Sequence, residues 1–260
     1  MALILGCTRR ELIFTGGGSE SANLAVKGVA LARREAGKGN HLIVSAIEHH
    51  AVLHAAEQLQ RHFGFALTVL PVDDAGLLRP DDLRAALRPE TALVSVMYAN
   101  NEIGTVQPIA ELGAICREAG VPFHTDAVQA PGALPLDVEA LNVDLLSLTA
   151  HKFYGPKGVG LLYARRGMPM QPQTSGGAQE LRRRAGTENV PGIVGLAAAL
   201  ARAEARRASE APRLRALRER LVDGVLARIP QSWLNGDRER RLPGNANLGF
   251  ACVEGESVLL

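Results

Sequence analysis

The chain has 260 residues, 47% of them hydrophobic, and can fill a sizeable core as one large domain or two smaller ones. Its net charge of +2 gives no strong field for nucleic acid or a membrane surface, and no apolar run reaches the ~20 residues of a membrane span. The three cysteines lie far apart, the N-terminus lacks a secretory pattern, and we expect a cytoplasmic protein without nucleic acid or membrane partners.

Short apolar runs alternate with amphipathic stretches over most of the chain. The runs are rich in Val, Ile and Leu, as expected of strands that are buried on both faces of a sheet. The expected strands are Leu12–Thr15, His41–Ala46, Leu67–Leu70, Ala92–Met97, Pro122–Thr125, Leu145–Leu148 and Val159–Tyr163. The expected helices between them are Ser19–Glu35, His50–His62, Pro80–Leu87 and Pro108–Ala119. This alternation predicts a three-layer α/β fold with a mostly parallel sheet covered by helices.

The character of the sequence changes after Pro191. Residues 192–229 are rich in Ala, Arg, Leu and Glu and predict a long helix that is bent or broken near 209–212, and residues 247–252 predict a strand. We therefore expect a large domain over residues 1–207 and the start of a smaller α+β domain over 208–260. Both ends look cut, since the chain opens on an apolar stretch and stops in what resembles a first helical turn, so we expect a fragment.

Three glycines and a serine follow the first expected strand, in the segment Thr15-Gly16-Gly17-Gly18-Ser19-Glu20. Glycines let the backbone approach a ligand closely, and the N–H groups at the start of a helix favour an anion such as phosphate. The segment has neither the Gly-Lys-Ser/Thr ending of a Walker loop nor the spacing of the dinucleotide fingerprint. A tight strand–helix turn explains these glycines about equally well.

Two charged residues follow later strands. Asp126 lies at the end of an expected strand, where ligands of open α/β sheets bind, and its carboxylate could stabilise a cationic ring nitrogen. Lys152 also follows a strand, and a lysine held in such a pocket can form a Schiff base. Thr149 and His151 beside it could contact a phosphate. Taken singly, a helix-capping aspartate and a surface lysine are the simpler interpretations.

Histidines and asparagines occupy two further strand ends. His49 follows the strand over 41–46, and an imidazole there can stack on an aromatic cofactor and shuttle protons. His50 and His54 have the spacing of a metal-binding pair, but zinc is the weaker interpretation without a third ligand nearby. Asn101 could bond a carboxylate or phenolate oxygen, or could simply form a turn.

Together these features occur in a definite order: glycine loop, histidine, asparagine, Asp126 and Lys152, nearly all at strand ends. Pyridoxal 5′-phosphate (PLP) requires such parts, namely a phosphate anchor, a ring stack, a partner for the pyridinium nitrogen and a Schiff-base lysine. The pattern predicts a PLP site and no metal. The run Arg182–Arg184 could suggest a nucleic-acid surface, but a solvated or interface face fits the near-neutral total charge better.

These motifs resemble those of cysteine desulfurases, in the class V aminotransferase-like branch of fold type I PLP enzymes. The resemblance is carried by Thr15–Asn23, Glu48–Val52, Asn100–Gly104, His124–Gln129, His151–Gly158, Arg184–Asn189, Asn235–Asp237 and Val253–Ser257, and it covers nearly the whole chain. It implies the fold type I large domain and an enzyme that takes sulfur from L-cysteine. Alanine would leave, and a persulfide would serve an iron–sulfur scaffold or another sulfur-acceptor protein.

The same resemblance implies roles for single residues. Lys152 would hold PLP as a Schiff base and move protons, Asp126 would pair with the pyridine nitrogen, and His49 would stack on the ring and act in acid–base steps. Gln129 would contact the ring phenolate, and Asn101 that oxygen or the substrate carboxylate. The implied phosphate contacts are Gly18, Ser19, Thr149 and His151. Thr187 matches a residue that reaches the phosphate of the neighbouring subunit, which implies a homodimer.

The chain departs from the family pattern in three places. Its glycine loop differs from the usual Thr-Ser-Gly-Ala-Thr-Glu, and Leu181 stands where glycine is common. None of Cys7, Cys116 and Cys252 matches the nucleophilic cysteine, and we expect all three to be structural. We therefore expect the 260-residue chain alone to be inactive. A selenocysteine lyase or another class V PLP enzyme, and a non-catalytic PLP-binding or scaffold fragment, stay open as alternatives.

Overall fold

A seven-stranded sheet forms the centre of the protein in the computed structural model, which describes residues 1–259. Its strands are β1 (Leu12–Thr15), β2 (His41–Ser45), β3 (Ala66–Leu70), β4 (Thr91–Ser95), β5 (Phe123–Asp126), β6 (Leu145–Thr149) and β7 (Gly160–Ala164). Their order across the sheet is β1-β7-β6-β5-β4-β2-β3. The strands from β3 to β6 in this order are parallel, whereas β7 is antiparallel to both β1 and β6. The mostly parallel sheet expected from the sequence is confirmed.

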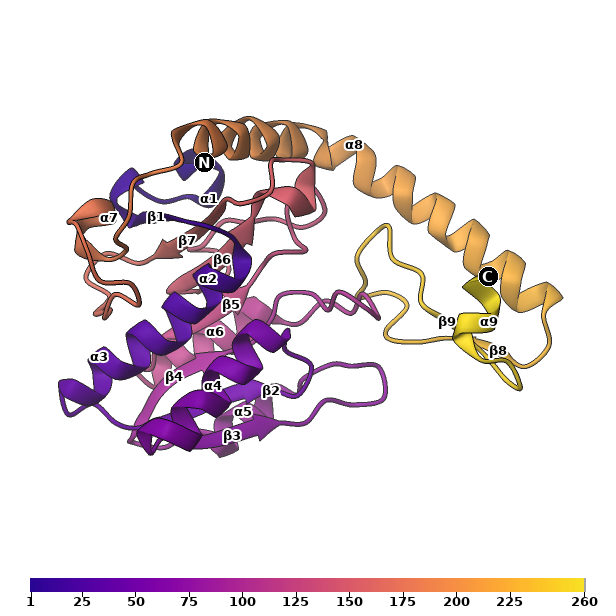
Figure 1. The fold of residues 1–260 in the computed structure, drawn as a ribbon. Coiled ribbons are helices and arrows are strands. Elements are labelled where there is room, and N and C mark those ends of the chain that lie inside the picture. The colour runs from indigo at the N-terminus through magenta and orange to yellow at the C-terminus, as the bar shows by residue number, and fades with distance from the viewer. Residues whose placement is uncertain (260) are drawn as a thin grey trace.

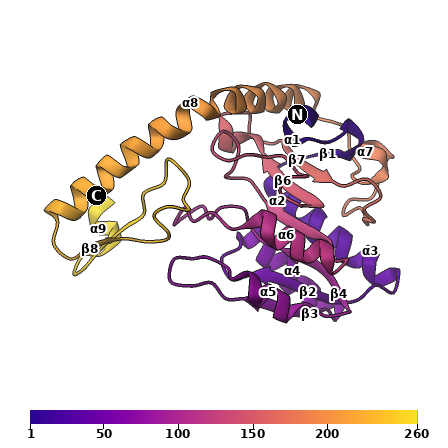
Figure 2. The same ribbon diagram turned by 180° about the vertical axis from the view of Figure 1, so that it is seen from behind.

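Helices cover both faces of this sheet and make three layers. One face carries α2 (Gly18–Asn23), a π-helical segment (Leu24–Gly28), α3 (Val29–Glu35) and α4 (His50–Phe63). The other carries α5 (Pro80–Ala86), α6 (Ile109–Glu118) and the first part of α8 (Val190–Arg228), and Figures 1 and 2 show the two faces in turn. Each face has its own apolar cluster of buried side chains. The strands β2, β4 and β6 are consequently buried along their whole length.

The amphipathic pattern of α4 shows why the sequence folds in this way. Val52, Ala55, Ala56 and Leu59 follow the i, i+3, i+4, i+7 spacing and are all buried against the sheet. The shorter elements are α1 (Ala2–Leu5), the 3₁₀ turns Arg9–Glu11 and Ala150–Phe153, and α7 (Gln179–Arg182). Within the described residues, no helix is long and apolar enough to cross a membrane.

The helix α8 leaves the sheet body and leads to a small unit (Figure 1). It is a single helix of 39 residues with Pro212 in its interior, so the expected long helix is confirmed and is not broken at this proline. Proline removes one backbone hydrogen bond and favours a bend, and Figure 1 shows the helix changing direction along its length.

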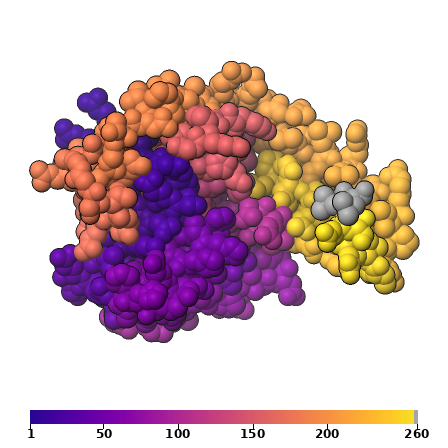
Figure 3. Space-filling model, viewed as in Figure 1, coloured from indigo at the N-terminus to yellow at the C-terminus, as the bar shows by residue number. Residues whose placement is uncertain are grey.

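The small unit consists of an antiparallel pair, β8 (Ser232–Leu234) and β9 (Leu248–Phe250), followed by α9 (Gly255–Leu259). The space-filling view shows it projecting from one side of the sheet body (Figure 3). The strand expected over 247–252 corresponds to β9, and the expected terminal helix corresponds to α9, with Leu260 outside the described residues. The strand β8 was not expected.

Candidate functional site

The residues singled out from the sequence gather at one edge of the sheet. Asp126 is the last residue of β5 and Thr149 the last of β6, and Lys152 lies in the 3₁₀ turn that follows β6. His49 follows β2 on the other side of β4. Because the carboxyl ends of parallel strands meet at the same edge, these side chains surround a common space, as ligand sites of open α/β sheets do.

Asp126 is the buried carboxyl group of this site, with only 7% of its surface exposed. One carboxylate oxygen accepts a hydrogen bond from the Val128 N–H at 3.0 Å. Burial raises the pKa of Asp126, while the Val128 hydrogen bond and the electrostatic effects of His49 and Lys152 act in the opposite direction. The side chains of His49 and Lys152 are therefore close enough to interact with this carboxylate.

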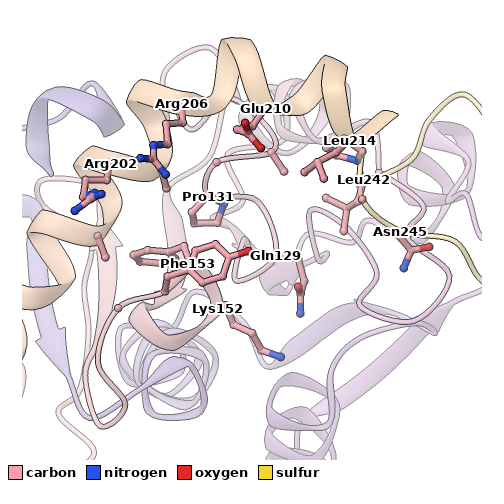
Figure 4. Close-up of a pocket in the computed structure, with 18 of the residues that line it drawn as sticks. Gln129, Pro131, Lys152, Phe153, Arg202, Arg206, Glu210, Leu214, Leu242 and Asn245 are labelled. Atoms are coloured by element: carbon pink, nitrogen blue, oxygen red, sulfur yellow. The ribbon is translucent and has the colours of Figure 1, made fainter. Parts of the chain in front are cut away.

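Lys152 lines a cavity of about 1010 Å³ together with Gln129 and Asn101. Figure 4 shows Lys152 and Gln129 on one wall of this cavity, with Arg206 and Glu210 of α8 on the other. Lys152 itself is exposed and Gln129 is half-buried. The cavity is therefore open to a small molecule that could reach the amine of Lys152.

His49 is held in a fixed orientation at the start of α4. Its Nδ1 accepts a hydrogen bond from the Ala51 N–H at 3.0 Å, as a helix-capping group does. The neighbouring His50 and His54 stack on each other with ring centroids 4.7 Å apart. In the part of the chain that the structure describes, no group of three His, Cys, Asp or Glu side chains is arranged to hold a metal ion.

A polar hollow of about 470 Å³ lies between the glycine loop and the turn after β6. It is lined by Gly16, Gly17, Gly18, Ser19, Glu20, Thr149, His151, Lys157 and Gly158. The Thr149 hydroxyl and His151 Nδ1 lie 3.2 Å apart. The lining offers hydroxyl, imidazole and ammonium groups as well as glycine backbone, which suit a phosphate group, while the Glu20 carboxylate is paired with Arg184. Lys157 was not among the residues expected to bind phosphate.

The glycine at position 18 allows the loop to lie close to its neighbours. A methyl group there would meet Val128 Cγ2 at 3.1 Å and Thr149 Cβ at 3.4 Å. Gly160 in β7 is more restricted, since a methyl group would lie 2.5 Å from the carbonyl carbon of Gly17. Gly160 was not among the residues singled out from the sequence, although a glycine inside a strand often marks such a close approach of two backbones.

The segment after α7 is bound to the glycine loop. Arg184 pairs with Glu20 at 2.7 Å, and Glu20 also accepts the Gly16 N–H at 2.6 Å. Thr187 is exposed and lines a small cavity beside Gly16. Arg183 donates to the backbone oxygen of Arg10 at 2.7 Å, so two members of the run Arg182–Arg184 are engaged within the fold. These contacts weaken the interpretation of this run as a nucleic-acid surface.

The cysteines partly contradict the sequence interpretation. Cys116 is buried in α6 as expected, and burial raises its pKa far above the ordinary value. Cys7 is half-buried, and burial, with a smaller effect from Glu11, raises its pKa to about 11. The expectation that Cys252 is a structural, buried residue is wrong: it is exposed and lies beyond the end of β9, in a left-handed backbone conformation.

The donor set at this edge fits PLP. The parts of the cofactor each find a matching group: a buried carboxylate, an amine in an open cavity, a fixed imidazole and a polar hollow for phosphate.

Glu48 and His124 are two further buried polar residues near this edge of the sheet. His124 is held between the hydroxyls of Ser95 and Ser147, and burial lowers its pKa to about 3, so it is a neutral part of the sheet.

Comparison with known proteins places this site in a family. The whole chain, residues 1–260, matches the profile of the aminotransferase class-V family. It is 54% identical over 256 residues to the cysteine desulfurase IscS of Methanosarcina thermophila, covering 98% of this chain and 62% of that protein. It is 52% identical over 260 residues to the IscS of Dictyoglomus turgidum, covering 100% of this chain and 65% of that protein. The chain thus spans less than two thirds of these relatives.

Solved structures agree with this assignment. A NifS-like protein matches with a TM-score of 0.93 and 37% identity, covering 99% of this chain and 70% of that one. DndA from Streptomyces lividans matches with a TM-score of 0.91 and 38% identity, covering 99% of this chain and 73% of that one. The resemblance inferred from the motifs is confirmed: the chain belongs to the aminotransferase class-V family and is similar to proteins named as cysteine desulfurases.

Proposed function

We propose that the protein to which this chain belongs is a PLP-dependent cysteine desulfurase. It would remove sulfur from L-cysteine, leave alanine and pass the sulfur to an acceptor such as an iron–sulfur scaffold protein. The observation that supports this most directly is the grouping of His49, Asp126 and Lys152 at adjacent strand ends beside a polar hollow. The names of the relatives support the reaction, and a solved relative, SspA, is described in complex with cysteine.

The residues would divide the work around the cofactor, which when bound supplies an electron sink for the substrate. Lys152 would bind the cofactor through its amine and move protons at the substrate Cα. Asp126 would hold a proton on the ring nitrogen, and His49, oriented through its Nδ1, would cover one face of the ring. Gln129 and Asn101 would contact the ring oxygen or the substrate carboxylate from the wall of the cavity.

The phosphate would lie in the polar hollow. Its contacts would come from Gly18, Ser19, Thr149 and His151, all of which line that hollow. Thr187 would reach the phosphate of a second subunit in a homodimer. The large domain over residues 1–207 would then contain the cofactor groups, and the region 208–260 would begin a smaller domain.

The sulfur-accepting thiol is not expected among the cysteines of this chain. A nucleophilic cysteine needs an accessible thiolate, whereas burial raises the pKa values of Cys7 and Cys116. Cys252 is exposed but lies in the small unit beyond β9. We therefore expect the 260-residue chain to bind PLP without releasing sulfide from L-cysteine.

The first experiment compares the purified protein with its Lys152→Ala variant. The wild-type protein should show the visible absorption band of lysine-bound PLP, and Lys152→Ala should lose it. Lys38→Ala, which changes an exposed lysine in another loop, serves as the control. An unchanged spectrum in Lys152→Ala would contradict the assignment. Sulfide release from L-cysteine by the full-length protein, compared with selenide release from L-selenocysteine, separates a desulfurase from a selenocysteine lyase.

A further inference from the structure

Glu48 is a buried carboxyl group that none of these roles uses. It lies in the turn between β2 and α4, one residue before His49, and only 6% of its surface is exposed. Its Oε1 accepts hydrogen bonds from the Ser45 hydroxyl at 2.5 Å and from the Met97 backbone N–H at 2.7 Å. These bonds tie the turn that carries His49 to the segment that follows β4.

The second carboxyl oxygen, Oε2, is buried and has no hydrogen-bond partner among the described residues. A carboxylate with a bare buried oxygen is costly, because its charge loses hydration without gaining a donor. A carboxylic acid fits the contacts better, since Oε1 can accept both hydrogen bonds as the carbonyl oxygen while Oε2 carries the proton. Burial raises the pKa of Glu48 to about 8, and the nearby charge of Asp126 contributes to this rise.

Asp126 and Glu48 are two buried carboxyl groups near the ends of β5 and β2. Two carboxyl groups that interact closely do not readily both ionise, and their surroundings decide which of them keeps the proton. Asp126 accepts the Val128 N–H, and Lys152 and His49 beside it favour its ionised form. Glu48 accepts two hydrogen bonds that lower its pKa, but the groups that act most strongly on it include the charge of Asp126 and no cation. The cation Lys152 acts on Asp126, and it therefore favours the negative charge on Asp126 rather than on Glu48.

We propose that Glu48 is a neutral positioning residue, which fixes the turn that carries His49 and keeps the negative charge of the cluster on Asp126. The inference rests on the proposed PLP function, since it concerns the side of the site that faces the ring nitrogen. A second ionised carboxyl group would raise the pKa of Asp126 and allow it to take up a proton. The neutral state of Glu48 thus protects the charge that the ring nitrogen needs.

The test titrates PLP into the cofactor-free protein and compares the PLP affinity of wild type with that of Glu48→Gln, Glu48→Ala and the exposed control Glu111→Gln. Glutamine keeps the acceptor oxygen and the neutral state, so PLP affinity should stay within about threefold of wild type. Alanine removes both hydrogen bonds, and PLP should bind at least about tenfold more weakly. A Glu48→Gln variant that binds PLP as weakly as Glu48→Ala, or that does not fold, would overturn the proposal.

Thermal unfolding at different pH values gives a readout that an ionised structural glutamate would not produce. Native Glu48 keeps its proton up to about pH 8, whereas in the unfolded chain it loses the proton near its ordinary pKa of 4.5. Wild-type stability should therefore fall between about pH 5 and pH 8 relative to Glu48→Gln, in which this group cannot titrate. The Tm difference should grow in favour of the variant across this window.

Two controls distinguish failure of the proposal for Glu48 from failure of the proposed PLP function. The Tm difference between Glu111→Gln and wild type should not follow this pattern, since Glu111 is exposed on α6. A flat difference for Glu48→Gln would show that Glu48 is ionised in the native state and would overturn the proposal. Asp126→Asn tests the proposed function itself: if it binds PLP as well as wild type, the ring-nitrogen role fails regardless of the result at Glu48.

Discussion

Replacing Gly160 by alanine would press β7 against the glycine loop. The added methyl group would lie 2.5 Å from the carbonyl carbon of Gly17 and 2.7 Å from its Cα and oxygen. Carbon atoms in contact normally lie about 3.5 Å apart, so the loop or the strand must move by about 1 Å. Both contacting groups are backbone, and the strand is held by its pairing with β1 and β6, so no side-chain rotation can relieve the clash.

Overpacking of this kind costs about 1–3 kcal/mol. If the loop moves away to relieve it, PLP must restore the loop on binding, and the same energy corresponds to about 5- to 150-fold in the Kd. Titration of the cofactor-free variant with PLP measures this loss, and thermal unfolding without PLP shows whether the fold is intact. Gly255→Ala is the matched control, because a methyl group there would meet no atom within 4 Å. A folded Gly160→Ala variant that binds PLP within about twofold of wild type would refute the reasoning.

Three further changes test other parts of the site. Arg184→Ala should weaken PLP binding several-fold, because it leaves the Glu20 carboxylate unpaired beside the polar hollow, and adding Glu20→Gln should restore part of the loss in the same titration. Leu181→Gly should raise the free energy of unfolding slightly, by less than about 1 kcal/mol, and so raise the Tm, since Leu181 has a φ of +57° and glycine takes that conformation without strain but gains entropy when unfolded. A thiol-reactive dye should label the exposed Cys252 before the buried Cys116, and equal rates would contradict the burial of Cys116.

The sheet and the location of the site were predictable because both depend on local patterns. The apolar run over 41–46 gave β2 to within one residue, since a strand buried on both faces must be apolar throughout. Asp126 and Lys152 follow such runs, and the rule that ligands bind at the carboxyl ends of parallel strands places them together. Their grouping therefore needed no knowledge of long-range contacts.

What the sequence did not reveal depends on contacts between distant segments. The roles of Gly160 and Glu48 appear only when β7 lies beside the glycine loop and the turn after β2 lies beside Met97. The strand β8 has three residues, too short a run to give a periodic signal. Pro212 suggested a possible break, but a proline removes only one helical hydrogen bond, and the rest of the long helix α8 maintains its course.

The two sides of the large cavity have different structural origins. The cofactor side, with Asp126 and Lys152, is built by the sheet and the turns that follow its strands. The loop that carries Asn101 is instead bound to the small unit: the Leu242 N–H donates to the Gly104 oxygen at 2.9 Å, and the Asn245 amide donates to the oxygen of Glu102 at 2.9 Å.

Residues 242–245 also line this cavity, together with Lys152 and Asn101. A movement of the small unit would therefore shift Asn101, which is proposed to contact the ring oxygen or the substrate carboxylate, while Asp126 and Lys152 stay attached to the sheet. A change in the small unit can therefore move Asn101 without moving Asp126 or His49, because the hydrogen bonds that fix Asp126 and His49 come from residues next to them in sequence.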